Sequence, residues 1–486
     1  MSAPSLRIAL VTSEMTPFMK TGGLADVSAA LPRALARLGH EVTVFLPRYG
    51  RIPFPPGEFA GSVHVPVDAS PRSAGYYRKK LEDGLEVVFI EHPPFFERPQ
   101  PYGPNSNEDY GDNRLRFAFL ARAALEYLRS RGQRPDVFHA HDWQAGLVPV
   151  YLKSFYWDDP ALYRSPCVFT IHNLAYQGTF GHDTLDVLGL PWHFASGEAL
   201  GHQGGLSYMK GGIQFSEMVT TVSPQYAREI QGGEMGYGLD GTLRGRAADL
   251  VGILNGVDYG EWDPRHDKHI AARYSADDLA GKDECKRDLL ATLGLPAEPD
   301  VPIVGIISRL VAQKGIDIVA DAWYDLLQRP IRMVVLGTGE ARLEHALRSL
   351  AERAPDRFAV RLTYDEGLAH KIEAGADIFL MPSRFEPCGL TQMYSLRYGT
   401  VPVVRSTGGL YDTVEPWDPA TGRGTGFRFD NPDGTGLMWA LDQALATFKD
   451  RAVWEQLVRN GMEKDFSWDR SAEAYVEVFR RAIAKV

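Results

Sequence analysis

The chain has 486 residues, of which 44% are hydrophobic and 23% are charged, and its formal net charge is -10. This length exceeds what one hydrophobic core usually organises, so we expect a soluble protein of two domains. The acidic balance argues against nucleic acid as the main partner.

The sequence also predicts where the protein works. No apolar run approaches the roughly 18 residues that span a bilayer, so no membrane partner is expected. Residues 1–6 lead straight into a predicted strand and leave no room for a signal peptide. Three scattered cysteines do not suffice for a disulfide framework or a Cys-ligated zinc site, which is typical of a reducing compartment. We therefore expect a cytoplasmic protein.

The N-terminal stretch predicts a strand, a loop, a helix and a second strand. Residues 8–12 are continuously apolar, apolar positions recur at helical spacing over 24–38, and 42–46 read as the next strand. Gly22 and Gly23 lie where the loop meets the helix, and such a pair lets backbone approach a diphosphate that Lys20 can also reach. By themselves most Gly pairs are only turns, and no Gly-x-Gly-x-x-Gly supports a nicotinamide dinucleotide site.

Residues 52–113 are rich in proline, glycine and aromatics, with one predicted strand at 85–90. Within this region, residues 95–110 are either a carbohydrate-contacting loop over a cleft or an ordinary surface loop. The side chains suited to carbohydrate contact are Tyr102, Asn105, Asn107 and Tyr110.

Two further predicted strands end in polar side chains. His139 and His141 share a face of one strand, which ends at Asp142, and His172 with Asn173 lies at the end of the next. A metal centre would need a third ligand and supporting partners that this spacing does not supply, so we predict none. Instead, Asp142 is expected to accept hydrogen bonds from sugar hydroxyls and His172 to donate one.

The strand and helix alternation restarts after Gly256, where we predict the domain boundary. Strands are predicted at 303–307 and 331–336, and helices at 282–293, 316–327 and 340–353. Arg309 and Lys314 flank the carboxyl end of the first of these strands. They could neutralise a diphosphate leaving group, or form a solvated charge pair that needs no explanation.

The stretch at residues 383–394 follows a buried strand predicted at 377–381 and leads into a helix. Glu386 and Cys388 should therefore lie at a strand's carboxyl end, beside a helix expected to start at Pro387, Cys388 and Gly389. Taken alone, Glu386 would more often be an acidic residue favoured by the helix dipole.

Three features complete the second half. Tyr364 follows a short strand, and its ring could stack on a nucleobase. The strand predicted at 401–404 precedes Thr407, Gly408 and Gly409, a second Gly-Gly loop placed like the first. Residues 468–486 are predicted to be a helix with an apolar stripe.

These motifs together resemble the bacterial glycogen synthase and plant starch synthase family. The resemblance runs from about residue 7 to the C-terminus and rests on six co-linear motifs. They are Lys20-Thr-Gly-Gly-Leu-Ala-Asp26, His139-Ala-His-Asp-Trp143, Ile171-His-Asn-Leu-Ala-Tyr176, Ser308-Arg-Leu with Gln313-Lys-Gly315, Glu386-Pro-Cys-Gly-Leu-Thr-Gln392 and Thr407-Gly-Gly-Leu410.

The resemblance implies a GT-B glycosyltransferase fold: two Rossmann-like α/β domains facing across a deep cleft. It implies an N-terminal domain at 1–255 on the acceptor side and a C-terminal domain at 256–467 on the nucleotide-sugar side. The helix at 468–486 would cross back to pack on the N-terminal domain. The implied activity is retaining transfer of glucose from ADP-glucose to the non-reducing end of an α-1,4-glucan, with no cofactor and no metal.

The resemblance also implies roles for individual residues. Lys20, Gly22 and Gly23 would meet the phosphates, and Arg309 and Lys314 would stabilise the departing ADP. Further residues are assigned by the family pattern to catalysis, nucleotide-sugar binding or acceptor binding: Glu386, His172 and Asp142 around the glucose, Tyr364 beside the adenine, Cys388, Gly389, Leu390, Thr407, Gly408 and Gly409 at the nucleotide sugar, and Tyr102, Asp142 and Asn173 at the acceptor.

One position departs from the wider GT-B superfamily. Many relatives carry a second glutamate eight residues after the first, and here that position is Tyr394. Because the ribose contact is usually given to that carboxylate, the nucleotide preference stays open. A UDP-glucose-dependent synthase, a GT-B nucleotide-sugar epimerase and a non-catalytic glucan-binding protein are the alternatives.

Retention can arise by double displacement, which requires a carboxylate beneath the anomeric carbon, or by front-face departure and attack. Glu386 is the only motif carboxylate at a strand end in the second half, and the family pattern places it near the sugar's far hydroxyls. We therefore favour the front-face route.

Overall fold

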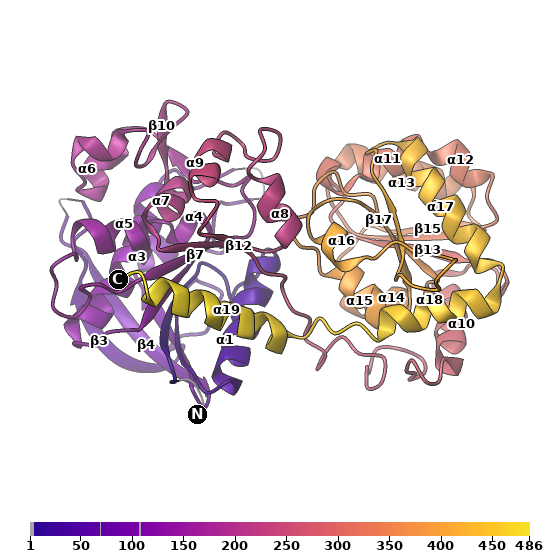
Figure 1. The fold of residues 1–486 in the computed structure, drawn as a ribbon, viewed down its shortest axis with the longest axis horizontal. Coiled ribbons are helices and arrows are strands. Elements are labelled where there is room, and N and C mark those ends of the chain that lie inside the picture. Colours follow the sequence, from indigo (N-terminus) through magenta and orange to yellow (C-terminus); the bar gives the residue numbers. More distant parts are fainter. Residues whose placement is uncertain (1–3, 69, 106–107) are drawn as a thin grey trace. The chain divides into compact units, whose positions relative to one another are not determined.

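The computed structural model describes residues 4–68, 70–105 and 108–486. Contacts between Cα atoms divide it into two compact units, one running through Gly256 and taking up Trp468–Val486, the other formed by Val257–Ser467. The boundary predicted between residues 255 and 256 lies one residue before this division. Figure 1 shows each unit as a sheet covered by helices, with the last helix drawn among the elements of the first unit.

The first unit is built on a mixed sheet of nine strands in the order β12-β11-β7-β6-β1-β2-β5-β4-β3. Pairing is parallel from β12 to β5 and antiparallel from β5 through β4 to β3. The strands are β1 (Arg7–Val11), β2 (Glu41–Pro47), β3 (Glu58–His64), β4 (Ser73–Glu82), β5 (Leu85–Glu91), β6 (Val137–His141), β7 (Cys167–Ile171), β11 (Met218–Thr221) and β12 (Leu250–Gly252). Beside it, β8 (Thr179–Phe180), β10 (Gly205–Ser207) and β9 (Gly201–His202) form a small antiparallel sheet.

The helices of this unit include several of only one or two turns. They are α1 (Gly23–Arg37), α2 (Pro93–Phe96), α3 (Asn113–Ser130), α4 (Asp142–Ala145), α5 (Leu147–Ser154), α6 (Thr184–Leu188), η1 (Trp192–Ala195), α7 (Tyr208–Phe215), α8 (Pro224–Glu229), α9 (Asp240–Gly245) and α19 (Trp468–Ile483). The last of these packs against α1 and buries Tyr475 and Phe479 completely. The helix predicted at 468–486 therefore forms, ending at Ile483, and packs within the first unit.

The second unit has a six-stranded, entirely parallel sheet in the order β15-β14-β13-β16-β17-β18. The strands are β13 (Ile303–Ile307), β14 (Arg332–Leu336), β15 (Phe358–Arg361), β16 (Ile378–Met381), β17 (Val401–Arg405) and β18 (Phe427–Phe429). Its helices are α10 (Ala280–Leu293), η2 (Ala312–Lys314), α11 (Ile316–Asp321), α12 (Trp323–Leu327), α13 (Ala341–Arg353), α14 (Glu366–Gly375), α15 (Thr391–Arg397), α16 (Gly408–Thr413), α17 (Gly434–Phe448) and α18 (Arg451–Met462).

Three expectations about local structure are wrong. The proline-rich region before residue 85 forms β3 and β4, whose partly exposed, charged sequences hide the strand pattern. The helix predicted at 316–327 breaks at Ala322 into α11 and α12. The helix predicted to start at Pro387 begins only at Thr391, because Gly389 has a positive φ of 72° and residues 386–390 form a bent, non-helical segment, called the Glu386 turn below.

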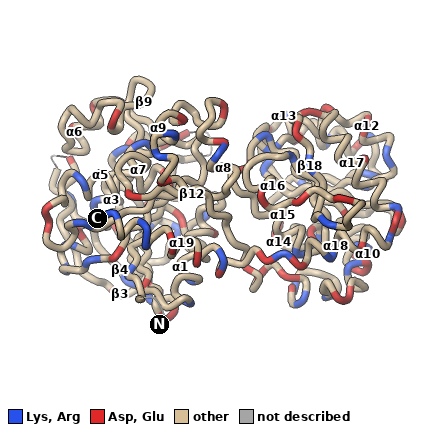
Figure 2. Tube along the Cα trace, viewed as in Figure 1, with Lys and Arg blue, Asp and Glu red and all other residues tan. Residues whose placement is uncertain are grey.

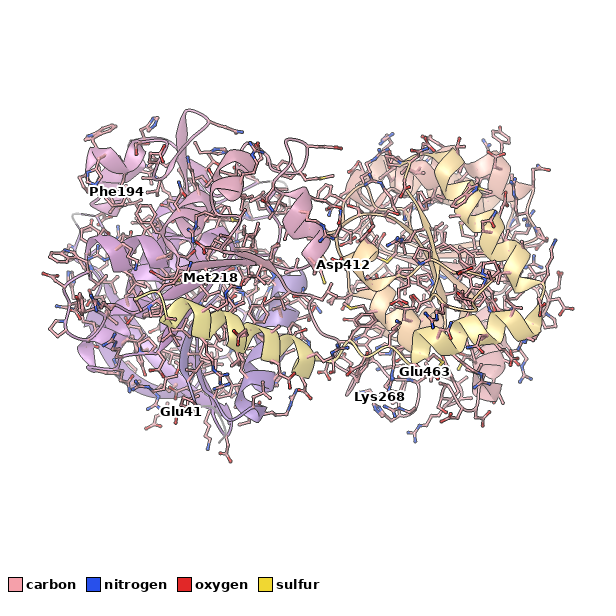
Figure 3. The ribbon with its side chains drawn as sticks, viewed as in Figure 1. Glu41, Phe194, Met218, Lys268, Asp412 and Glu463 are labelled. Atoms are coloured by element: carbon pink, nitrogen blue, oxygen red, sulfur yellow. The ribbon has the colours of Figure 1, made fainter. Side chains whose placement is uncertain are left out.

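Charges are distributed without large single-sign regions. Figure 2 shows Lys and Arg interspersed with Asp and Glu along the trace of both units. In the described part of the chain, no helix is long and apolar enough to cross a membrane. The buried side of the sheets is apolar: Met218 of β11, labelled in Figure 3, is fully buried inside the first unit.

Candidate active site

Sheet order places the predicted site residues within each unit. In the first unit β1 has β2 on one side and β6 on the other, and in the second β13 lies between β14 and β16. Where the strand order reverses in this way, the loops after neighbouring strands part and leave a crevice at their carboxyl ends. The loops after β1, β6, β13 and β16 carry most of the residues that the sequence singled out.

The loop after β1 is organised around Glu14, a residue that the sequence analysis did not select. Its carboxylate is 3% exposed and accepts hydrogen bonds from the backbone N–H of Thr21 at 2.5 Å and of Gly22 at 3.3 Å. The hydroxyls of Thr21 and Tyr102 donate to it at 2.6 and 2.5 Å. The only signal in the sequence was an acidic residue two positions after a predicted apolar strand.

The two glycines of this loop are not required by packing. A Cβ atom built on Gly22 or Gly23 meets no atom within 4 Å. The N-terminus of α1 is therefore open on that side, as a backbone that approaches a bound anion would need. Lys20 lies at the same loop, and its Nζ donates to Asp26 at 2.8 Å.

Tyr102 lies half-buried in the segment for which the sequence left open a carbohydrate-contacting loop or an ordinary surface loop. Its hydroxyl contacts Ser13 Oγ at 2.8 Å besides donating to Glu14, so it supports the loop after β1. Burial, and next the charge of Glu14, raise the pKa of Tyr102 well above its ordinary value. Asn105 is exposed and Tyr110 partly so, whereas Asn107 lies outside the described residues.

The ends of β6 and β7 give each of the predicted histidines a hydrogen-bond partner. His139 Nε2 lies 2.7 Å from Thr170 Oγ1, and His141 Nδ1 lies 2.9 Å from His172 Nε2. Burial lowers the pKa of both His139 and His172 to about 3, so both rings are neutral at pH 7. Because these rings carry no charge, they can act as hydrogen-bond donors and acceptors toward the hydroxyls of a ligand.

Asp142 follows β6 in a left-handed conformation with φ of 54°. Its Oδ1 accepts the backbone N–H of His172 at 2.8 Å, which joins the ends of β6 and β7. Burial raises the pKa of Asp142 to about 7 despite that hydrogen bond. A carboxyl poised near neutrality on a strained residue is typical of a functional site. Asn173, next to His172, accepts from the N–H of Ala175 at 3.0 Å.

In the second unit the loops after β13 and β16 are joined by an ion pair. Lys314 Nζ lies 2.5 Å from Glu386 Oε2, which also accepts from Ser383 Oγ at 3.1 Å. Glu386 is only 6% exposed, whereas Arg309 in the same β13 loop is exposed. Glu386 is therefore held in place by a cation and a hydroxyl, and Arg309 projects into solvent.

The second Gly-Gly pair differs from the first. A Cβ on Gly408 would lie 2.0 Å from the carbonyl oxygen of Glu386, and one on Gly409 1.9 Å from that of Cys388. The N–H of Gly409 donates to the carbonyls of Glu386 and Pro387 at 3.1 and 3.2 Å. These glycines let α16 pack onto the Glu386 turn. Both Gly-Gly pairs lie where a strand leads into a helix, as predicted, but their surroundings differ.

Four of the remaining predicted residues lie in or beside this turn, and Tyr364 lies after β15. Cys388 and Thr407 are buried, and Gly389 and Leu390 are half-buried. The Gln392 side chain donates to the carbonyls of Cys388 and Gly389 at 3.0 and 3.1 Å, which fixes the turn. Tyr364 is 81% exposed, an unusual setting for a large aromatic ring and one that suits stacking on a ligand.

Tyr394 is part of an aromatic stack that the sequence did not reveal. Its ring lies parallel to that of Trp262, with centroids 4.2 Å apart and an interplanar angle of 2°. Trp262 in turn stacks on His370 at 3.8 Å and 9°. The position where relatives have a second glutamate is thus occupied here by an aromatic packing contact.

Comparison with known proteins first defines the class. The catalytic domain of starch synthase IV from Arabidopsis thaliana, bound to ADP and acarbose, superimposes with a TM-score of 0.90 over 99% of this chain and 100% of that chain, at 37% identity. Sucrose-phosphate synthase from Thermosynechococcus elongatus, at 19% identity and a TM-score of 0.61, shares the fold. The protein is a glycosyltransferase of the GT-B fold.

Sequence comparison narrows the class to a family. The starch synthase catalytic domain family matches residues 7–245, and the glycosyl transferases group 1 family matches 294–460. The glycogen synthase of Anaeromyxobacter sp. (strain Fw109-5) is 51% identical, with 99% of this chain and 100% of that chain aligned. That of Koribacter versatilis (strain Ellin345) is 48% identical over 98% of each. The chain belongs to the glycogen synthase family.

Proposed function

We propose that this protein transfers glucose from ADP-glucose to the non-reducing end of an α-1,4-glucan, with retention at the anomeric carbon. The observation that carries the donor is the near-full-length similarity to a starch synthase domain bound to ADP and acarbose. The glucan acceptor follows from the relatives' activity, glycogen synthesis. We propose a cytoplasmic location on the same ground.

The residue roles extend the proposal. Lys20 and the open backbone at Gly22 and Gly23 bind phosphate, and Arg309 with Lys314 stabilises the charge that develops on departing ADP. Tyr364 stacks on the adenine. Asp142, His172 and Glu386 contact the transferred glucose, and Cys388, Gly389, Leu390 and Thr407 shape its pocket. Tyr102 and Asn173 support the acceptor side.

We propose front-face transfer, in which ADP leaves and its phosphate takes the proton of the attacking hydroxyl. Support comes from Glu386, whose Oε2 is held by Lys314 and Ser383. A carboxylate neutralised in this way is a poor nucleophile and a good hydroxyl acceptor. Cationic side chains supply the charge stabilisation, so the transfer step itself is proposed to need no metal.

The deciding experiment measures nucleotide release and glucan growth with ADP-glucose and with UDP-glucose, each with and without glycogen. We expect ADP release that depends on glycogen and is matched by added glucose. Preferential UDP release would favour the UDP-glucose alternative. Interconversion of nucleotide sugars without glycogen would favour an epimerase, and binding without turnover a non-catalytic protein. Arg342→Ala, an exposed substitution on α13, serves as the folded control.

A further inference from the structure

The second unit contains a group of potential metal ligands outside the residues assigned above. Among the described residues, Glu261, Glu366 and His370 each offer one donor atom, and these atoms lie within 4.8 Å of one another. Glu366 and His370 are four residues apart on α14 and so share one face of that helix. Glu261 lies in the segment before α10; of that segment, Figure 3 labels Lys268.

His370 distinguishes this group from an ordinary acidic cluster. The side chain is 1% exposed, and its Nδ1 lies 2.7 Å from Asp267 Oδ2. A carboxylate can only accept, so Nδ1 carries a proton and donates it. The second nitrogen, Nε2, is buried and has no hydrogen-bond partner among the described residues. Leaving a buried polar nitrogen unpaired is costly, which indicates that it serves a ligand.

The surroundings fix the ring in this orientation. Asp267 also accepts from Tyr398 Oη at 2.5 Å and from the backbone N–H of His269 at 2.7 Å. Trp262, the neighbour of Glu261, stacks flat on the imidazole at 3.8 Å. A histidine that donates through one nitrogen to an anchored carboxylate, and turns the other toward carboxylates, is the arrangement that supports metal ligands in proteins.

We propose that Glu261, Glu366 and His370 bind a divalent transition-metal cation of the zinc class. One imidazole nitrogen and two carboxylate oxygens suit Zn²⁺, with water completing a tetrahedron. With Zn–ligand distances of about 2.0–2.1 Å, donor atoms lie about 3.4 Å apart. Both glutamates are exposed, so their side chains can close from the observed separation by rotation while the buried His370 stays in place.

The cation would be structural. It would cross-link the segment that carries Glu261 and Trp262 to the first turn of α14, next to Tyr364. Because Trp262 also stacks on Tyr394 of α15, the cation would also stiffen the packing of the helix that follows the Glu386 turn. It contacts none of the residues assigned to glucose or phosphate, so this inference stands or falls separately from the proposed function.

The test uses the full chain, freed of metal with a chelator and titrated with Zn²⁺ alone by calorimetry and with Co²⁺ by visible absorption. We expect one equivalent to bind, tetrahedral Co²⁺ bands, and a melting temperature that rises with free Zn²⁺. The double variant Glu261→Gln and Glu366→Gln should bind at least 100-fold more weakly and lose the Co²⁺ bands. Glu352→Gln, an exposed glutamate on α13, is the matched control and should behave as the parent does.

A second variant, at a different ligand, guards against the possibility that the double variant loses metal only because it misfolds. His370→Gln keeps a donor toward Asp267 but removes the imidazole ligand, and we expect the Co²⁺ bands to vanish in it as well. Absence of saturable binding to the parent would overturn the proposal. So would binding that survives unchanged in the double variant, because the metal would then sit elsewhere.

Discussion

Lys314 and Arg309 occupy the same loop but differ in what they contact. Lys314 is paired with the buried Glu386, whereas Arg309 is exposed. Lys314 therefore both positions the carboxylate and adds positive charge, and Arg309 keeps its charge for a ligand.

The first prediction concerns the proposed phosphate-binding cations. Arg309→Ala and Lys20→Ala should each lower kcat on the order of 100-fold or more, because the lost charge matters most as ADP departs. Steady-state kinetics with ADP-glucose and glycogen measures this, with Arg342→Ala as control. A raised KM with unchanged kcat would contradict the leaving-group role.

The second prediction concerns Glu386 and the mechanism. Glu386→Gln should lose most activity and retain some, because an amide still accepts and donates hydrogen bonds without the charge that pairs with Lys314. Cys388→Ser should stay active. A slow fluorinated donor should leave no sugar ester on the parent protein by mass spectrometry. A trapped adduct on either side chain would establish double displacement instead.

At the level of elements, the loop after β1 depends on the four hydrogen bonds that Glu14 accepts. In Glu14→Gln the amide oxygen can accept from the N–H groups of Thr21 and Gly22, while its NH₂ donates to the hydroxyls of Thr21 and Tyr102. We expect this variant to keep near-parental stability. Glu14→Ala leaves those groups unpaired and should cost about 2–3 kcal/mol of unfolding free energy in urea titrations. Equal losses in both variants would show that the charge itself is required.

The buried histidines at the ends of β6 and β7 should make the stability of the fold sensitive to acid. The folded-state pKa of His139 is about 3, below its ordinary 6.5, because burial, and next the charge of His172, oppose protonation. Below pH 6.5 the unfolded chain binds a proton that the folded chain refuses, so stability falls as the pH drops from 6.5 toward 3.

Urea unfolding at pH 7 and pH 4.5 tests this. His139→Gln should reduce the loss of unfolding free energy between the two pH values by about 2 kcal/mol, while loss due to His141 and His172 remains. The control His64→Gln, at an exposed position, should leave the loss unchanged. An unaltered pH dependence in His139→Gln would contradict the neutral, buried state.

For the whole molecule, the last helix belongs energetically to the first unit. Phe479 is fully buried and its ring lies 5.2 Å from that of His139 on β6. Phe479→Ala should cost about 3–5 kcal/mol. This loss should lower the melting temperature of the first unit's thermal transition. Val403→Ala, a truncation in the core of the second unit, should leave the melting temperature of the first unit unchanged.

Phe59→Ala is the matched control for that experiment. Phe59 is 59% exposed on β3, so the same truncation there should change stability by less than about 1 kcal/mol. A shift of the second unit's transition by Phe479→Ala would mean that α19 is not part of the first unit's core.

The sequence by itself determined the alternation of strands and helices, because parallel strands buried on both faces are continuous apolar runs. It also determined which residues follow the carboxyl ends of those strands, since Asp142, Arg309 and Glu386 each come within five residues after such a run. Family membership followed from the order and spacing of six motifs, and comparison confirmed it.

Only the tertiary structure decided which side chains meet. Glu14 contacts Tyr102, 88 residues away, and Lys314 contacts Glu386, 72 residues away, through pairings that no local pattern encodes. The two Gly-Gly pairs look alike in sequence, yet one faces open space and the other packs against backbone carbonyls. Close packing and long-range hydrogen bonds depend on how distant segments are brought together. For the same reason, the buried Nε2 of His370, which has no hydrogen-bond partner among the described residues, could be recognised only in the folded chain.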